Sequence, residues 1–116
     1  TPEEYQRTLA KQYIDAGADL VIGSHPHVLQ GIEYYKDKPI VYSLGNFMFY
    51  STINQTAVLK VTLNDNDGVQ VQFLPCKAAN GITYKIDNQA ERSEFNRYMT
   101  ELSFHVKFDE NGIVQN

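Results

Sequence analysis

Cysteine is almost absent from this chain, because Cys76 is the only one among its 116 residues. A single cysteine excludes an internal disulfide and any metal site built from several thiolates. Cys76 follows Pro75 in a strand-like run, so we expect it to be a small packing residue. One cysteine does not reveal the redox compartment of the protein.

Long apolar runs and clusters of positive charge are also missing. No run approaches the roughly 20 apolar residues of a membrane span, and no signal peptide opens the chain. The net charge is −4 and the basic residues are scattered singly, which argues against nucleic acid or an anionic membrane as the main partner. Because the first residues already resemble a helix start, we expect a soluble piece of a longer protein.

The composition that remains is ordinary for a soluble globular protein, with 42% apolar and 21% charged residues. The opening residues predict a helix, with Thr1 as its N-cap, Pro2 in its first turn and Glu4 completing a capping box. Gly17 is expected to end this helix. Apolar residues recur at helical spacing and predict its buried face: Tyr5, Leu9, Tyr13 and Ala16.

The rest of the chain predicts a mixed α/β fold in one structural unit over residues 1–116. Residues 18–22 form an almost wholly apolar run without alternation, which is typical of a strand buried on both faces. The polar residues 23–27 follow directly, as expected where an α/β sheet presents functional residues. Strands are expected at 31–35 and 39–44, followed by a hairpin of 57–63 with 69–74. A second helix is expected over 88–102, and its apolar face holds Phe95, Tyr98, Met99 and Leu102. A last hairpin is expected within 104–114.

His25 and His27 are the most informative candidates for chemistry. In a loop that leaves a strand they can converge, or each can address one of two adjacent metal ions, and Pro26 between them restricts the backbone. Imidazole is the commonest ligand of transition metals such as Zn, Mn and Fe. Gly23 would let the backbone approach an ion or phosphate closely. Two surface histidines bonded to their neighbours are the alternative, and the residues alone leave both interpretations open.

Two further polar residues are weaker candidates. Asn46 could bind substrate from a neighbouring strand end, although Gly45-Asn46 is also a common turn pair, which we favour. Glu33 could accept a hydrogen bond from a histidine N–H and so orient it, or could be a solvated carboxylate at a strand edge.

Other stretches have simpler explanations. Residues 65–68 resemble part of a calcium loop but lack its spacing, so a hairpin turn is expected. His105 is expected on a strand face. The aromatic residues 47–50 predict core packing rather than a lid.

Two stretches, GADLVIGSHPHVLQGIE at 17–33 and KPIVYSLGNF at 38–47, resemble the CapA-type poly-γ-glutamate capsule biosynthesis proteins of the PGA_cap family. That family is similar to the calcineurin-like metallophosphoesterases, whose last motif is Gly-His-x-His after a sheet strand. The resemblance implies the C-terminal part of a layered α/β sandwich, with a mixed sheet and flanking helices.

The resemblance also implies a site. His25 and His27 would be the last two ligands of a centre of two divalent ions (Mn, Fe or Zn). Ser24 displaces Gly23 by one place from the phosphoesterase glycine. The remaining ligands would lie upstream, since no Asp-x-His, Gly-Asp-x-x-Asp or Asn-His-Asp/Glu stretch occurs here. Because such a site needs three or four protein ligands, this chain alone is expected to hold no metal stably and to be inactive.

The function implied is capsule biosynthesis through a metal-dependent, phosphoesterase-like hydrolase or transferase site. The alternative is a non-catalytic accessory subunit that binds polymer or partner proteins during capsule synthesis and export. The implied partners are capsule-synthesis membrane proteins and poly-γ-glutamate, with no nucleic acid. The implied location is the outer side of the cell envelope, with a membrane anchor upstream of this chain.

Overall fold

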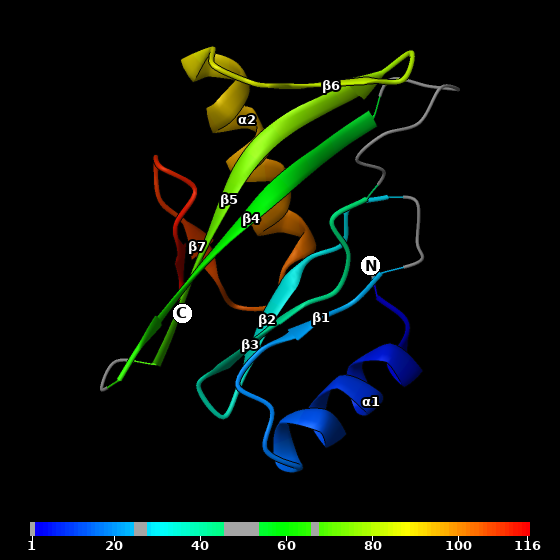
Figure 1. Cartoon of the computed structure of the whole chain (residues 1–116), viewed down its shortest axis with the longest axis vertical. Helices are drawn as coiled ribbons and strands as arrows, with labels where there is room; N and C mark the ends of the chain where they lie inside the picture. Colours follow the sequence, from blue (N-terminus) through cyan, green and yellow to red (C-terminus); the bar gives the residue numbers. More distant parts are fainter. Residues whose placement is uncertain (1, 25–27, 46–53, 66–67) are drawn as a thin grey trace.

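The computed structural model describes residues 2–24, 28–45, 54–65 and 68–116, and Figure 1 shows its course. These residues confirm the predicted mixed α/β class. They form helices α1 and α2 and eight strands, with the bounds α1 Glu4–Asp15, β1 Val21–Ile22, β2 Ile32–Tyr35, β3 Lys38–Val41, β4 Asn54–Asn64, β5 Gly68–Ala79, β6 Ile82–Lys85, α2 Gln89–Leu102, β7 Lys107–Phe108 and β8 Val114–Gln115.

The first sheet has the strand order β1-β3-β2 and is mixed. β1 runs parallel to β3, whereas β2 is antiparallel to β3. Lys36 and Asp37 join β2 to β3 with φ angles of 50° and 63°, the backbone of a two-residue hairpin turn. The two strands predicted at 31–35 and 39–44 are therefore confirmed, and they pair as a hairpin.

The second sheet has the order β4-β5-β6 and is antiparallel throughout. The predicted hairpin of β4 and β5 is confirmed and is longer than expected, because its pairing extends from Asn54 with Ala78 to Asn64 with Gly68. Strand β6 was not among the predicted elements. Asn80 and Gly81 both have positive φ and connect Ala79 to its register partner Ile82. An Asn-Gly pair of this kind is the strongest short hairpin signal, so β6 was predictable.

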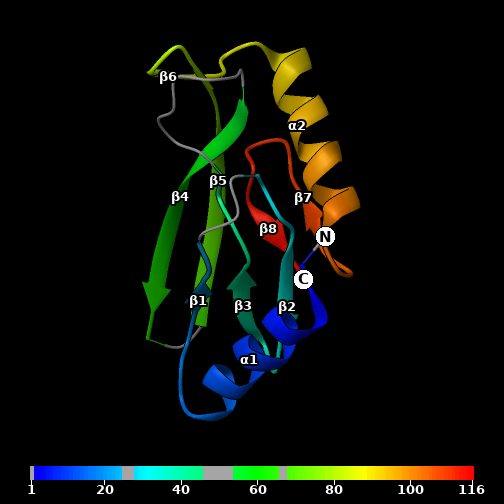
Figure 2. The ribbon, with the colours of Figure 1, turned by 90° about the vertical axis from the view of Figure 1, so that its right-hand side faces the viewer.

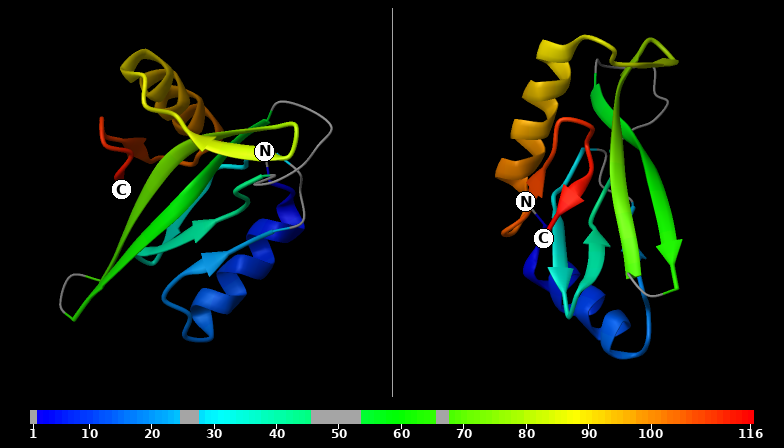
Figure 3. Two further views of the ribbon diagram at one scale, coloured as in Figure 1. Left: turned by 45° about the horizontal axis from the view of Figure 1, so that its top comes forward. Right: turned by 90° about the vertical axis from the view of Figure 1, so that its left-hand side faces the viewer.

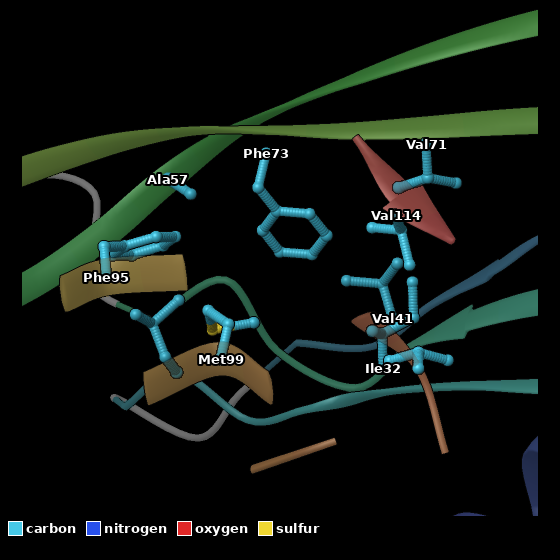
Figure 4. Close-up of a cluster of buried hydrophobic side chains, with 10 residues drawn as sticks. Ile32, Val41, Ala57, Val71, Phe73, Phe95, Met99 and Val114 are labelled. Carbon is cyan, nitrogen blue, oxygen red and sulfur yellow. The ribbon is translucent and has the colours of Figure 1, made fainter. Parts of the chain in front are cut away.

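The main core lies between the two sheets and is closed by α2 and the β7–β8 hairpin. Ile32 and Val41 come from the first sheet, Phe73 from the second, and Phe95 and Met99 from α2, as Figure 4 shows. A smaller core lies on the opposite face of the first sheet, where Ala10, Ile14, Ile40 and Tyr42 pack together. Figures 1 and 3 show α1 and α2 at opposite ends of the molecule.

Helix α1 differs from its prediction at its start and in its buried face. The N-cap is Glu3, whose backbone N–H donates to the Gln6 side chain at 2.6 Å, so the capping box involving Thr1 and Glu4 was wrong. The predicted face was wrong too, because Tyr5, Leu9 and Tyr13 are 70%, 44% and 53% exposed. The helix turns a neighbouring face inward, and the buried residues of that face are Ala10 and Ile14.

The apolar run at 18–22 also differs from its prediction. Strand β1 is limited to Val21 and Ile22, and Ile22 is 52% exposed. Among the described residues β3 is the one strand that pairs with β1, so β1 lies at an edge of the sheet (Figure 2). The expectation of a strand buried on both faces is therefore wrong for the chain as it stands.

The C-terminal part follows the sequence more closely. Asn88 caps α2 by accepting hydrogen bonds from the N–H groups of Ala90 (2.9 Å) and Glu91 (3.2 Å). Phe95 and Met99 are buried as predicted, and Cys76 is a buried packing residue. His105 is not on a strand, because it has a φ of 58° and β7 begins only at Lys107.

Candidate functional site

The two candidate segments follow two neighbouring strands of the first sheet. His25 and His27 come after β1, and Asn46 comes soon after β3. Because β1 and β3 are parallel, their carboxyl ends meet at the same end of the sheet. Open α/β sheets bind ligands at this end. His25, His27 and Asn46 themselves lie outside the described residues, so the structure places their flanking residues only.

Hydrogen bonds around Ser43 hold these flanking residues together. The buried Ser43 hydroxyl donates to the Val28 carbonyl at 2.9 Å and accepts from the Gly45 N–H at 3.1 Å. The Ser43 carbonyl accepts from the Gln30 N–H at 3.2 Å. Ser43 therefore connects the residues after the histidine pair to the residues before Asn46.

Thr56 adds a third segment to this arrangement. Its fully buried hydroxyl donates to the Leu44 carbonyl at 2.6 Å, which ties β4 to the end of the β3 segment. Leu44 also forms a bridge to Leu29. Sequence reasoning missed both Ser43 and Thr56, because a hydroxyl within a strand pattern gives no sign of its partner.

Gly23 has a structural reason to be glycine. Its N–H donates to the Val41 carbonyl at 2.7 Å, and a Cβ atom at this position would collide with the carbonyl oxygen of Tyr42. The small residue thus lets β1 lie close against β3 immediately before the histidine segment. A further role beside an ion or phosphate stays a prediction.

Glu33 lies between α1 and the first sheet and is only 8% exposed, which contradicts the interpretation as a solvated edge carboxylate. Arg7 donates to both of its oxygens, from Nε to Oε2 at 3.1 Å and from Nη2 to Oε1 at 2.9 Å. The Tyr42 hydroxyl donates to Oε2 at 2.8 Å, and Lys11 Nζ lies 3.5 Å from Oε1. We call Arg7, Lys11, Glu33 and Tyr42 the Glu33 cluster.

The cluster explains why α1 turns its predicted apolar face away from the sheet. Arg7 and Lys11 share the inward face with Ala10 and Ile14, since these positions are three or four residues apart. The Arg7 guanidinium also lies over the Phe104 ring, 4.0 Å from its centroid. A buried carboxylate needs cationic partners, and α1 supplies two of them.

These contacts decide the charge of Glu33. Burial by itself would raise the pKa of its carboxyl, but the hydrogen bonds from Arg7 and Tyr42 and the charges of Arg7 and Lys11 outweigh it and hold the pKa below its usual range. Burial and the bond to Glu33 raise the pKa of the Tyr42 hydroxyl. Glu33 is therefore an anion at neutral pH, and its proposed contact with a histidine stays a prediction.

The donor set for a metal is incomplete among the described residues. Those residues contain no group of three or more His, Cys, Asp or Glu side chains that could hold an ion. Two imidazoles are suitable ligands but too few for a stable transition-metal site, and Glu33 is already bonded to Arg7 and Tyr42. A metal centre of the implied kind needs ligands from other parts of the protein.

Neither α1 nor α2 combines the length and the apolar content that a helix needs to cross a membrane, within the part of the chain that the structure describes.

Comparison with known proteins finds similarity to capsule proteins. Residues 1–51 match the model of the family described as bacterial capsule synthesis protein PGA_cap. The capsule biosynthesis protein CapA of Bacillus anthracis is 34% identical over 103 residues, which are 86% of this chain and 25% of that protein. The PGA biosynthesis protein CapA of Bacillus subtilis (strain 168) is 40% identical over 77 residues, which are 64% of this chain and 20% of that protein.

A shorter stretch of the chain matches another protein with higher sequence identity. The uncharacterized protein y4sH of Sinorhizobium fredii (strain NBRC 101917 / NGR234) is 54% identical over 48 residues, which are 41% of this chain and 10% of that protein. The chain thus spans a quarter or less of the length of the curated relatives it matches. All four candidate residues, His25, His27, Glu33 and Asn46, lie within the part that matches the family model.

Proposed function

Because this chain belongs to the PGA_cap family of bacterial capsule synthesis proteins through residues 1–51, we propose that the intact protein makes or processes poly-γ-glutamate capsule at a metal-dependent, phosphoesterase-like site. The reaction is a hydrolysis or a group transfer on an ester or amide. This chain contributes His25 and His27 as two of the metal ligands.

The parallel pairing of β1 with β3 is the observation that carries this proposal. It brings the chain on either side of the histidine pair to the same sheet edge as the residues before Asn46. Side chains at such an edge can act together on one ligand. The same residues lie within the family match. The Glu33 cluster lies on the face of the first sheet that α1 covers, and it holds α1 against that sheet.

Each residue has a defined part in the proposed site. His25 and His27 bind the ions through neutral imidazole nitrogens. Asn46 hydrogen-bonds the substrate, and Glu33 orients a histidine or holds the sheet beneath the site. Two divalent ions held by these ligands would supply Lewis-acid chemistry, which activates water and neutralises charge on the reacting group.

The setting of this activity is part of the proposal. The partners are membrane proteins of capsule synthesis and the poly-γ-glutamate chain itself. The intact protein works on the outer side of the cell envelope and is anchored to the membrane by a segment outside residues 1–116.

A non-catalytic accessory subunit is the second candidate. It is the alternative because the described residues contain no group of three or more His, Cys, Asp or Glu side chains that could hold an ion. In this case the same sheet edge binds polymer or partner proteins without turnover.

The deciding experiment measures metal content by mass spectrometry in the intact protein, compared with His25→Ala and His27→Ala variants. We expect about two transition-metal ions per chain, with a clear loss in each variant, as a two-metal hydrolase site requires. His105→Asn is the matched control, since it removes an imidazole from a position whose positive φ suits asparagine. It should keep the full metal content.

Metal content that neither histidine variant changes would contradict the metal site and leave the accessory subunit as the function. Metal lost in both variants, together with hydrolysis of ester or amide substrates, would support the catalytic role. Metal lost without any detectable turnover would support a metal-stabilised accessory.

A further inference from the structure

Three large side chains form an exposed apolar ridge along α1. Tyr5, Leu9 and Tyr13 are spaced by four residues, so they stand above one another on one side of the helix. They are 70%, 44% and 53% exposed. Single exposed apolar residues are common, but a continuous row of them marks a surface that another part of a protein covers.

The ridge stands beside the unpaired edge of β1. Ile22 on this strand is 52% exposed. The Gly23 N–H points to β3, where it bonds Val41, so the N–H of the preceding residue Ile22 points to the opposite edge. Among the described residues no strand pairs with that edge, which leaves backbone groups and an apolar side chain ready for a further strand.

An apolar cleft of about 180 Å³ joins the two features. It runs between α1 and the first sheet and is lined by Leu9, Tyr13, Ile22 and Ile40, among others. The exposed ridge, the cleft and the strand edge therefore form one continuous surface, which we call the α1–β1 surface. Figure 2 shows α1 in front of the sheet, with β1 on the outer side of β3.

We propose that the α1–β1 surface is an internal interface of the intact protein, where a further strand pairs in parallel with β1 and its flanking chain covers Tyr5, Leu9 and Tyr13. The occupant comes from the protein's own residues outside 1–116. The curated relatives are about four to ten times as long as the stretches that match them, so a chain of such length has ample residues for this role. This proposal does not depend on the metal site.

The connection between α1 and β1 indicates that the added strand runs parallel to β1. Helix α1 leads directly into β1 and packs on the face of the sheet, as the helix of a β-α-β unit does. Such units join parallel strands. Apolar runs without alternation belong to strands with neighbours on both edges and cover on both faces, and the apolar residues 20–22, which include β1, have this pattern.

The test uses lysine substitutions in the intact protein, read out by the midpoint of thermal unfolding. We expect Leu9→Lys and Ile22→Lys each to lower the midpoint by about 5 °C or more, because both place a charge in a covered apolar contact. Leu63→Lys and Ile82→Lys are the matched controls of the same residue types. These residues are 73% and 66% exposed and lie on the second sheet, so their midpoints should change by less than about 2 °C.

Amide exchange in the unsubstituted intact protein gives an independent measurement. The Ile22 N–H should exchange at least about a hundredfold more slowly than an unprotected amide, as expected of a strand-paired group. Fast exchange at Ile22, or equal midpoint losses in all four lysine variants, would overturn the proposal. Light scattering completes the test, since a dimer that Ile22→Lys converts to a monomer would identify a second copy as the occupant and would also overturn it.

Discussion

The carboxylate of Glu33 receives hydrogen bonds from Arg7 and Tyr42 in the contact between α1 and the first sheet. The same contact holds the cationic side chains of Arg7 and Lys11 against the sheet. At the scale of single residues, Glu33 is the one charged side chain among the buried residues that the structure describes. Its contribution to stability can be measured separately from the metal site.

Glu33→Gln should lower the free energy of unfolding by about 2 kcal/mol, because Arg7 loses its buried anionic partner while remaining partly solvated. Urea unfolding of the intact protein measures this change. Glu4→Gln is the control, since Glu4 is 86% exposed and lies 3.9 Å from the same arginine. Its loss should stay within about 0.5 kcal/mol, and equal losses in both variants would contradict the role given to the cluster.

The Glu33 cluster also predicts a pH dependence. The pKa of Glu33 is lowered in the folded protein, so its stabilising effect is complete above the ordinary carboxyl pKa of about 4.3 and is lost as the pH falls through the folded value. Between pH 5 and 3 the free energy of unfolding should therefore fall more steeply in the natural protein than in Glu33→Gln. Parallel curves would show that Glu33 is not ionised in the folded state.

At the scale of elements, the end of β1 depends on one close contact. Gly23 lies so near the Tyr42 carbonyl that any side chain would displace the strand. The position of the histidine segment relative to β3 rests on this contact and on the hydrogen bonds of Ser43.

Gly23→Ala should cost about 1–3 kcal/mol of stability, because the added methyl group meets rigid backbone atoms rather than a movable side chain. It should also speed amide exchange at residue 23 at least about tenfold, since the bond to Val41 weakens. Ser24→Ala at the exposed next residue is the control, expected within about 0.5 kcal/mol. Unchanged exchange at residue 23 would show that β1 tolerates the added group.

Local sequence signals predicted several elements well. The hairpins, the second helix and its buried Phe95 and Met99 follow from periodicity and turn residues. The apolar face of α1 could not be found in this way. Its orientation depends on Glu33, which lies 26 residues from Arg7 and carries no local sign of that partner.

At the scale of the whole molecule, Phe73 lies at the centre of the core between the two sheets. It is fully buried and packs edge-to-face on Phe108, with ring centroids 5.4 Å apart. Figure 4 shows it among side chains from both sheets and from α2. The packing of the two sheets therefore depends on this side chain.

Phe73→Ala should lower the free energy of unfolding by about 3–5 kcal/mol, the usual cost of a large cavity in a packed core. Leu63→Ala is the control, because Leu63 is 73% exposed and should change stability by less than about 0.5 kcal/mol. Both changes are measured by denaturant unfolding. A loss below about 1 kcal/mol at Phe73 would show that the two sheets do not share one core.

The mixed α/β class, most of the strands and the candidates His25, His27, Glu33 and Asn46 could all be predicted from the amino-acid sequence. These follow from local patterns and from a contiguous motif. Three features are visible only in the folded chain. The strands β1 and β3 end at the same end of the sheet, and the hydroxyl groups of Ser43 and Thr56 join the segments that flank the candidate residues. The hydrogen bonds between Glu33 and Arg7 fix which face of α1 packs on the sheet. The physical reason is that these contacts join residues far apart in the chain, and a residue's own neighbours do not specify its distant partner.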